Sequence, residues 1–309
     1  MSVYSLFAPN GPNGFGYAST AEDVTEGISL AGKRILVTGC NSGLGLETAR
    51  VLALRGVEVL GTARTVDKAN AALGALDGKT KGFACELADP ASVKACVKAV
   101  KTHLKRGKVD AIICNAGIMA LPKLEQAFGY ELQFFTNHIG HFILVTGLLD
   151  ALAANGRVVM LSSTAHTQAP KGGIEFDNLS GERDYTAWKT YGQSKMANLL
   201  FAKELARRFE GTKKTANSVH PGVIATNLWR HTNPLMALGV AVAGVFYTKS
   251  PEQGAATQCY VAVHPDAAKI SGQYFADCNV AKPREDGSDA ETARRLWTVS
   301  EEIVAGLLV

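Results

Sequence analysis

The sequence has no apolar run long enough to cross a membrane. The longest uncharged apolar run, Leu235 to Tyr247, has thirteen residues, whereas a spanning helix needs about 20. The amino-terminal segment also lacks the charged region and apolar core of a secretory signal. We therefore expect a soluble, cytoplasmic protein without a transmembrane segment, in which this run is a buried helix or a lid over the substrate pocket. Contact of the run with a bilayer surface or a lipophilic ligand is the alternative.

Cysteine motifs and blocks of like charge are also missing. The six cysteines are scattered without a C-x-x-C pair, which favours buried thiols in a reducing compartment over a disulfide framework. Lys and Arg number 32 against 28 Asp and Glu, without a basic block, so nucleic acid is not an expected partner. His138 and His141 are three residues apart, but no third ligand is spaced to join them, so we expect helix packing and no metal.

The composition is that of a globular protein. The chain has 309 residues, 47% of them hydrophobic and 19% charged, which excludes disordered and fibrous classes. A fold of this size buries roughly three quarters of the surface of the unfolded chain, so it needs no disulfide or metal for stability. Residues 1–30 contain several Gly and Pro residues and form an amino-terminal extension, and we expect residues 31–309 to form one domain.

Apolar, β-branched runs alternate with longer Ala- and Leu-rich stretches of helical spacing. This alternation is typical of strand–helix–strand units, and it predicts a doubly wound α/β domain with a parallel sheet and helices on both faces. The seven predicted strands are Arg34 to Thr38, Val57 to Gly61, Lys81 to Cys85, Ala111 to Cys114, Val158 to Ser162, Ala216 to His220 and Gly272 to Ala276. The clearest predicted helices are Leu44 to Arg55, Pro90 to His103 and Tyr191 to Glu210.

The first strand runs directly into a glycine-rich turn, Gly39-Cys-Asn-Ser-Gly43-Leu-Gly45, and then into a helix. Glycines let the backbone approach a pyrophosphate, which binds free N–H groups at the positive end of the helix dipole. Such turns also occur without a ligand, but the position between the first strand and helix predicts a dinucleotide site. The spacing G-x-x-x-G-x-G differs from the G-x-G-x-x-G of most nicotinamide dehydrogenases.

The end of the second strand bears on the choice of cofactor. An acidic residue about 20 residues beyond the glycine turn would bind an adenosine 2′-hydroxyl, but the sequence there is Gly-Thr-Ala63-Arg64. A guanidinium at this position can pair with a 2′-phosphate. We therefore favour NADP (NADPH) over NAD, with a solvated surface charge as the alternative interpretation of Arg64.

Four further motifs follow in order: Asn115-Ala-Gly117, Asn137, Ser162-Ser163 and Tyr191-x-x-x-Lys195. Together with the glycine turn they resemble the short-chain dehydrogenase/reductase family, over about residues 31–280. The surrounding residues, such as Thr136-Asn-His-Ile-Gly-His-Phe142 and His220-Pro-Gly-Val-Ile-Ala-Thr226, are similar to the retinol-dehydrogenase branch and to WW-domain oxidoreductases. The resemblance implies a single-domain Rossmann-type fold and an oxidoreductase acting on CH–OH groups.

The resemblance also implies which residues bind the cofactor. The glycine turn would hold the phosphates, and the Asn115 motif would lie near the adenosine. Glu86 stands where relatives usually carry Asp, which leaves its contact with adenine open. The implied cofactor-binding residues are Gly39, Asn41, Ser42, Gly43, Leu44, Gly45, Arg64, Glu86, Leu87, Asn115, Ala116, Gly117, Tyr191, Lys195, Pro221, Gly222, Val223 and Thr226.

Tyr191 and Lys195 are four residues apart and share a helix face. A nearby ammonium and an oxidised nicotinamide both favour the phenolate, so Tyr191 could exchange a proton near neutral pH. The resemblance implies that Ser163 bonds the substrate oxygen, with Ser162 as the neighbouring candidate, and that Asn137 holds a water linking Lys195 to solvent. Tyr191 would protonate the carbonyl oxygen as hydride reaches its carbon.

The substrate is the least determined feature of the sequence. The resemblance implies a mobile substrate lid at about residues 227–250, where Trp229, Phe246 and Tyr247 could contact a lipophilic carbonyl or alcohol or belong to the core. Residues 164–190 form an inserted loop that we expect to border the site. Alternatives are an NADPH-binding regulatory or interaction protein with little turnover, and an enone reductase. Family members commonly form dimers or tetramers, so a homo-oligomer is expected.

Overall fold

The structure is a computed structural model that describes Tyr4 and residues 7–224 and 248–307. Its centre is an eight-stranded sheet in the order β10-β9-β8-β7-β4-β1-β2-β3. All neighbouring strands in it are parallel except β9 and β10. The strands are β1 (Arg34–Thr38), β2 (Glu58–Ala63), β3 (Thr80–Ala84), β4 (Val109–Cys114), β7 (Leu152–Leu161), β8 (Thr215–His220), β9 (Tyr274–Ala276) and β10 (Asn279–Ala281).

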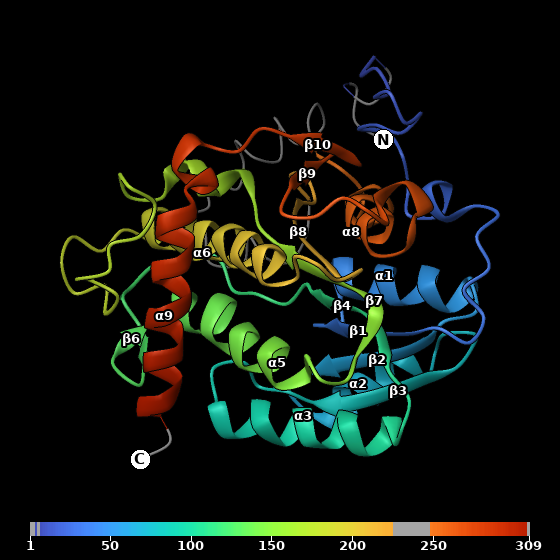
Figure 1. The fold of residues 1–309 in the computed structure, drawn as a ribbon, viewed down its shortest axis with the longest axis horizontal. Coiled ribbons are helices and arrows are strands. Elements are labelled where there is room, and N and C mark those ends of the chain that lie inside the picture. Colours follow the sequence, from blue (N-terminus) through green and yellow to red (C-terminus); the bar gives the residue numbers. More distant parts are fainter. Residues whose placement is uncertain (1–3, 5–6, 225–247, 308–309) are drawn as a thin grey trace.

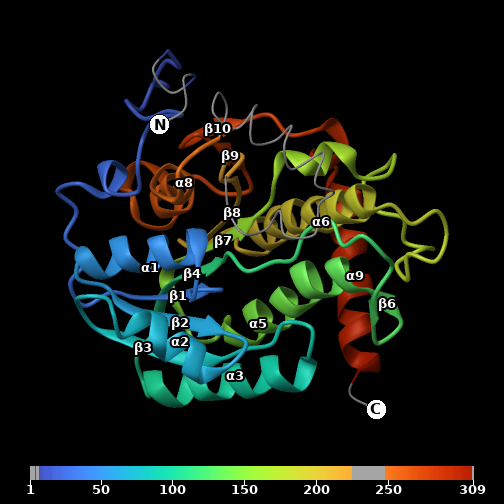
Figure 2. The same ribbon diagram turned by 180° about the vertical axis from the view of Figure 1, so that it is seen from behind.

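Helices cover both faces of this sheet, as Figures 1 and 2 show. One apolar core lies between the sheet and helices α3, α5, α6 and α9, and the other lies between the sheet and α1, α2 and α8. The central strands are buried on both sides, which explains their continuous apolar sequences. The helices are α1 (Gly43–Leu54), α2 (Val66–Leu73), α3 (Pro90–Leu104), α4 (Leu132–Phe134), α5 (Gly140–Leu148), α6 (Ala187–Arg208), α8 (Pro251–Val263) and α9 (Ala290–Gly306).

The predicted doubly wound fold is confirmed, and all seven predicted strands are present. The prediction of seven strands misses β10, which pairs antiparallel with β9 at the edge of the sheet. The connection consists of Asp277 and Cys278, both with positive φ, 49° and 63°. Such two-residue hairpins usually contain Asn or Gly, so the Asp-Cys pair and a three-residue strand gave no sequence signal. A separate small hairpin joins β5 (Gln126–Ala127) to β6 (Tyr130–Glu131).

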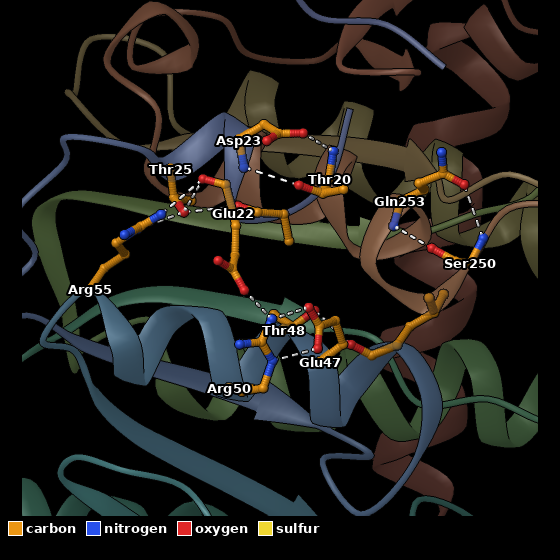
Figure 3. Close-up of polar contacts among 12 residues, drawn as sticks. Thr20, Glu22, Asp23, Thr25, Glu47, Thr48, Arg50, Arg55, Ser250 and Gln253 are labelled. Atoms are coloured by element: carbon orange, nitrogen blue, oxygen red, sulfur yellow. Dashed lines mark hydrogen bonds and ion pairs between the residues drawn. The ribbon is translucent and has the colours of Figure 1, made fainter. Parts of the chain in front are cut away.

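The amino-terminal extension packs against α1 and the start of α8. Its short 3-10 helix η2 (Asp23–Thr25) is preceded by Thr20, whose backbone N–H and side chain exchange hydrogen bonds with Asp23. Figure 3 shows Arg50 of α1 reaching both Glu22 of the extension and Glu47 of its own helix. Ala21 and Val24 are buried in the core on this side of the sheet.

Helix α9 packs along α6. Trp297 of α9 stands edge-on to Phe142 of α5 and stacks on Phe201 of α6, and Ser300 contacts the imidazole of His138 at 2.8 Å. The expected homo-oligomer remains a prediction.

The cysteines and the pair of His138 and His141 are buried in the fold. All six cysteines are free and buried, in line with the thiols predicted from sequence. No helix within the described residues is both long and apolar enough to span a membrane. Among the same residues, no three His, Cys, Asp or Glu side chains gather as a metal site would need.

Candidate active site

The predicted motifs meet at one edge of the sheet. Strands β1, β4, β7 and β8 are parallel neighbours, so the residues that follow their carboxyl ends lie at the same edge. In open α/β sheets this edge binds ligands where the strand order reverses. Here the reversal falls between β1 and β4, next to the glycine turn.

The glycine turn is shaped by two close approaches. Gly39 has a φ of +69°, which favours glycine. A side chain on Gly45 would overlap the carbonyl of Gly39 and the amide of Asn115. Glycines at 39 and 45 therefore let the turn fold tightly against the loop that follows β4.

The amino terminus of α1 remains open for an anion. Ser42 is the N-cap residue, but its side chain accepts no hydrogen bond from the first turn. The first N–H groups of a helix have no partner within it and carry partial positive charge. Asn41, Ser42, Gly43 and Leu44 thus stand where the turn can present backbone donors to a pyrophosphate, so the residues present fit a dinucleotide.

Asn115 joins the loop after β4 to the end of β1, where the glycine turn begins. Its side-chain amide donates to the carbonyl of Thr38 at 2.9 Å, and the backbone N–H of Ala116 donates to the Thr38 hydroxyl at 3.0 Å. Gln258 of α8 also donates to the Asn115 side chain at 3.4 Å. Sequence reasoning missed Thr38 and Gln258, since neither belongs to a recognisable spacing.

The residues that we expect near the adenosine differ in their surroundings. Arg64 directly follows β2 and is exposed, so its guanidinium is available to a ligand at the sheet edge. The Glu86 carboxylate accepts from the backbone N–H of Ala88 at 3.3 Å, and it therefore helps to shape its own loop. Leu87 is buried against Gly140 at the start of α5.

Asn137 lies in a π-helical turn, η3 (Phe135–Ile139). Such turns often occur at functional sites. The Asn137 side chain donates to the carbonyl of Ile118 and the hydroxyl of Ser194, both at 2.9 Å, and it accepts from the N–H of Ile118 at 2.9 Å. A Cβ added to Gly117 would lie 2.9 Å from Asn137 Oδ1 and 3.4 Å from Lys195 Nζ. These contacts bring Gly117, Asn137 and Lys195 together.

Tyr191 and Lys195 lie in the first half of α6, which begins at Ala187, one turn earlier than predicted. The Lys195 ammonium stands 5.6 Å from the centre of the Tyr191 ring and donates to the carbonyl of Leu161 at 3.2 Å. Ser162 and Ser163 make different contacts. The Ser163 side chain lies beside the Tyr191 hydroxyl, whereas Ser162 donates to the backbone carbonyl of Lys195 at 2.8 Å.

Burial dominates the electrostatics of this group. It raises the pKa of Tyr191 to about 12, although the neighbouring Ser163 side chain lowers the pKa in part. Burial also lowers the pKa of Lys195 to about 8, because desolvation disfavours each charged form. The prediction that Tyr191 exchanges a proton near neutral pH also invoked an oxidised nicotinamide, and it stays a prediction. Lys195 remains mostly protonated at pH 7.

Sequence reasoning also missed the residues that hold the Ser163 loop. The Thr164 N–H donates to Nδ1 of His220, at the end of β8, at 3.3 Å. His166 contacts the Ser163 carbonyl through Nδ1 at 2.6 Å and accepts from the Arg284 N–H through Nε2 at 3.0 Å. The Arg284 guanidinium further binds three carbonyls of this loop, those of Thr167, Ala169 and Pro170.

The loop after β8 lies at the same edge of the sheet. Pro221, Gly222 and Val223 follow His220, and Gly222 has a φ of +94°. Thr226 and most of the expected lid, with Trp229, Phe246 and Tyr247, lie outside the described residues. The lid prediction therefore remains a prediction. The inserted loop begins with a 3-10 helix, η4 (Thr164–Gln168), and packs on Gly192 of α6.

Comparisons with known proteins agree with this fold and site. The family model for short chain dehydrogenases matches residues 33–236. The short-chain dehydrogenase TIC 32 A, chloroplastic, of Brassica napus is 41% identical over 326 aligned positions, covering 99% of this chain and 100% of that protein. Retinol dehydrogenase 12 of Mus musculus is 38% identical, covering 91% of this chain and 89% of that protein.

Solved structures give the same result. A crystal structure of an uncharacterized protein from Mycobacterium Paratuberculosis has a TM-score of 0.74 and 31% identity, covering 91% of this chain and 97% of that one. A blue fluorescent protein from a metagenomic library, solved with NADPH, has a TM-score of 0.65 and 25% identity, covering 80% and 97%.

The fold and the site thus define a Rossmann-type oxidoreductase that uses a nicotinamide dinucleotide. The chain belongs to the short-chain dehydrogenase family, and its relatives include retinol dehydrogenases.

Proposed function

We propose that the protein is an NADP-dependent reductase and dehydrogenase that interconverts a lipophilic carbonyl compound and its alcohol. The observation that carries the proposal is the placement of the Ser163 side chain beside the buried Tyr191 hydroxyl, with Lys195 one helical turn away. These hydroxyl groups and this ammonium are the groups needed to hold a carbonyl oxygen and protonate it. The retinol dehydrogenase relatives support an apolar substrate.

The proposed cofactor site extends along the sheet edge. Gly39, Gly43, Gly45 and the first turn of α1 would hold the pyrophosphate, and Arg64 would pair with a 2′-phosphate. The loop of Pro221, Gly222 and Val223 would border the nicotinamide, which supplies or accepts a hydride when bound. The NADPH complex of the blue fluorescent protein supports this choice of cofactor.

Proton transfer would run through the buried side chains. In reduction, the Tyr191 hydroxyl donates its proton to the substrate oxygen while the carbonyl carbon receives the hydride, which gives the alcohol. The Ser163 hydroxyl holds the same oxygen, and the Lys195 ammonium stabilises the tyrosinate that forms. Asn137 fixes the loop of Gly117 and Ile118 beside Lys195. Oxidation of the alcohol is the reverse.

The direct experiment measures NADPH consumption with aldehydes, ketones, retinoids and steroids. Tyr191→Phe should retain the affinity for NADPH and lose about 10²- to 10⁴-fold in turnover, because it removes only the proton donor. Equal turnover of the variant and the wild type on a carbonyl substrate would exclude this role. Tight NADPH binding without turnover on any of them would favour the regulatory alternative, and reduction of enones alone would favour the enone reductase.

The expected location also needs a direct test. We propose a cytoplasmic protein, although the Brassica napus relative is chloroplastic by name. Fractionation of cells that produce the full chain, followed by detection with an antibody, should recover it in the cytosolic fraction. Recovery in an organelle fraction would contradict this expectation.

A further inference from the structure

One buried lysine belongs to none of the motifs that define the active site. Lys249 lies two residues before the start of α8, and its side chain is only 1% exposed. The ammonium pairs with the Asp277 carboxylate at 2.5 Å and lies 4.6 Å from the centre of the Tyr17 ring. Burying a charge is costly unless it is paired, so these two partners explain how the charge is tolerated.

The lysine stem packs on the loop after β8. A Cβ added to Gly222 would lie 2.6 Å from Lys249 Cδ, so the Gly222 backbone lies directly on the stem. The backbone N–H of Lys249 donates to the carbonyl of Val223 at 2.8 Å, and Lys249 forms an isolated β-bridge with Ile224. The side chain and backbone of Lys249 therefore both hold this loop.

The amino-terminal extension holds both partners of Lys249. Tyr17 belongs to it directly. Asn13 donates to the carbonyl of Cys278 at 2.7 Å, and Asn279 donates to the carbonyl of Phe15 at 3.0 Å. These two bonds fasten the β9–β10 hairpin, in which Asp277 lies, to the extension.

The start of α8 is fastened in the same way. Gln253 donates to the carbonyl of Ala18 at 3.2 Å, and Ala21 donates to the carbonyl of Glu252 at 2.8 Å. Figure 3 shows Gln253 and Ser250 forming the cap that follows Lys249. Residues 13–21 therefore reach Lys249 through the hairpin, through α8 and through the Tyr17 ring.

We propose that Lys249 is a positioning residue for the nicotinamide end of the cofactor, and that the amino-terminal extension is part of this site through Tyr17. The inference rests on the proposed function, because it assumes that the loop of Gly222 borders the nicotinamide. Lys249 acts on the cofactor through that loop. The extension thereby contributes to an active site from which its sequence is remote.

The test compares two ligands that share the adenosine end. NADPH carries the nicotinamide, whereas 2′,5′-ADP lacks it. Lys249→Ala should raise the dissociation constant for NADPH about tenfold, a change of about 1.4 kcal/mol, and leave that for 2′,5′-ADP unchanged in calorimetric titrations. Tyr17→Ala should also raise the dissociation constant for NADPH. Tyr17→Phe should keep the wild-type dissociation constant, because it retains the aromatic ring beside the ammonium.

A control separates positioning from a general loss of stability. Ile303→Ala in α9 removes a buried side chain from the opposite face of the sheet and should lower the melting temperature without changing the ratio of the two dissociation constants. If Lys249→Ala weakened the binding of NADPH and of 2′,5′-ADP equally, or weakened neither, the inference would be overturned and the proposed function would stand. Failure of the wild-type protein to bind either ligand would overturn both.

Discussion

Asn137 and Ile118 exchange two hydrogen bonds, one in each direction, and both are 2.9 Å long. The side-chain amide thus pairs with the backbone as a neighbouring strand would. The side-chain amide also donates to the Ser194 hydroxyl. The backbone carbonyl of Asn137 contacts Nδ1 of His141 at 2.9 Å. Asn137 therefore fastens the loop after β4 to α6, besides any role in holding a water.

Replacing Asn137 with Ala should reduce both stability and turnover. The N–H and carbonyl of Ile118 would lose their partner, which costs about 1–3 kcal/mol for each buried polar group left unsatisfied, whereas the Ser194 hydroxyl keeps its bond to the Tyr191 carbonyl. Urea unfolding and kcat measurements on the folded variant test both effects. Asn178→Ala is the matched control: Asn178 is buried and bonds Arg183 and Glu175 in the inserted loop, so that variant should lose stability and keep its turnover.

Replacing Arg64 with Ser should weaken NADPH binding and leave NADH binding unchanged. A guanidinium paired with a phosphate is a charge-assisted interaction of about 1.5–3 kcal/mol, so the dissociation constant for NADPH should rise by about one to two powers of ten. Fluorescence titration measures both affinities. Arg106→Ser, at an exposed position beyond the end of α3, should change neither affinity. An equal change in the affinities for NADPH and NADH in Arg64→Ser would show that Arg64 does not bind the 2′-phosphate.

The sequence predicted the parts of the site that rest on local patterns. The parallel strands followed from their apolar runs, and the glycine turn followed from its place between a strand and a helix. Ser163 was preferred over Ser162 by resemblance alone, and the structure gives the physical reason, since Ser162 is engaged with the α6 backbone. The functional roles of these residues remain predictions.

Other features depend on contacts between distant segments and gave no local signal. Arg284 lies more than a hundred residues from the loop that it holds, and Gln258 reaches Asn115 from α8. The surroundings of Tyr191 are a related case. The spacing to Lys195 was visible in the sequence, but the full burial that raises the pKa of the phenol was not.

The pH dependence of carbonyl reduction should reflect Lys195. Burial lowers the pKa of this ammonium to about 8, so the group is charged below pH 8 and loses its proton as the pH rises through that value. The proposed stabilisation of the tyrosinate is then lost, and kcat/KM for reduction should fall above about pH 8. Lys195→Met should react more slowly and show no inflection near pH 8. An unchanged inflection in that variant would assign it to another group.

The stability of the fold should fall in mild acid because of buried histidines. Burial lowers the pKa of His138 to about 3 and that of His141 to about 4, whereas a histidine in the unfolded chain has a pKa of about 6.5. Between these values the unfolded chain binds more protons, so the free energy of unfolding decreases as the pH falls below about 6.5. At pH 5 each of the two histidines should cost about 2 kcal/mol relative to pH 7.

His138→Gln isolates this effect, since a glutamine can still bond Ser300 but does not titrate in this range. Urea unfolding at pH 7 and pH 5 should show that the difference in unfolding free energy shrinks by about 2 kcal/mol in the variant. Ile303→Ala should lower the free energy at both pH values and keep the difference between them, because it removes no titrating group. If His138→Gln kept the wild-type difference, the acid sensitivity would have to arise elsewhere in the chain.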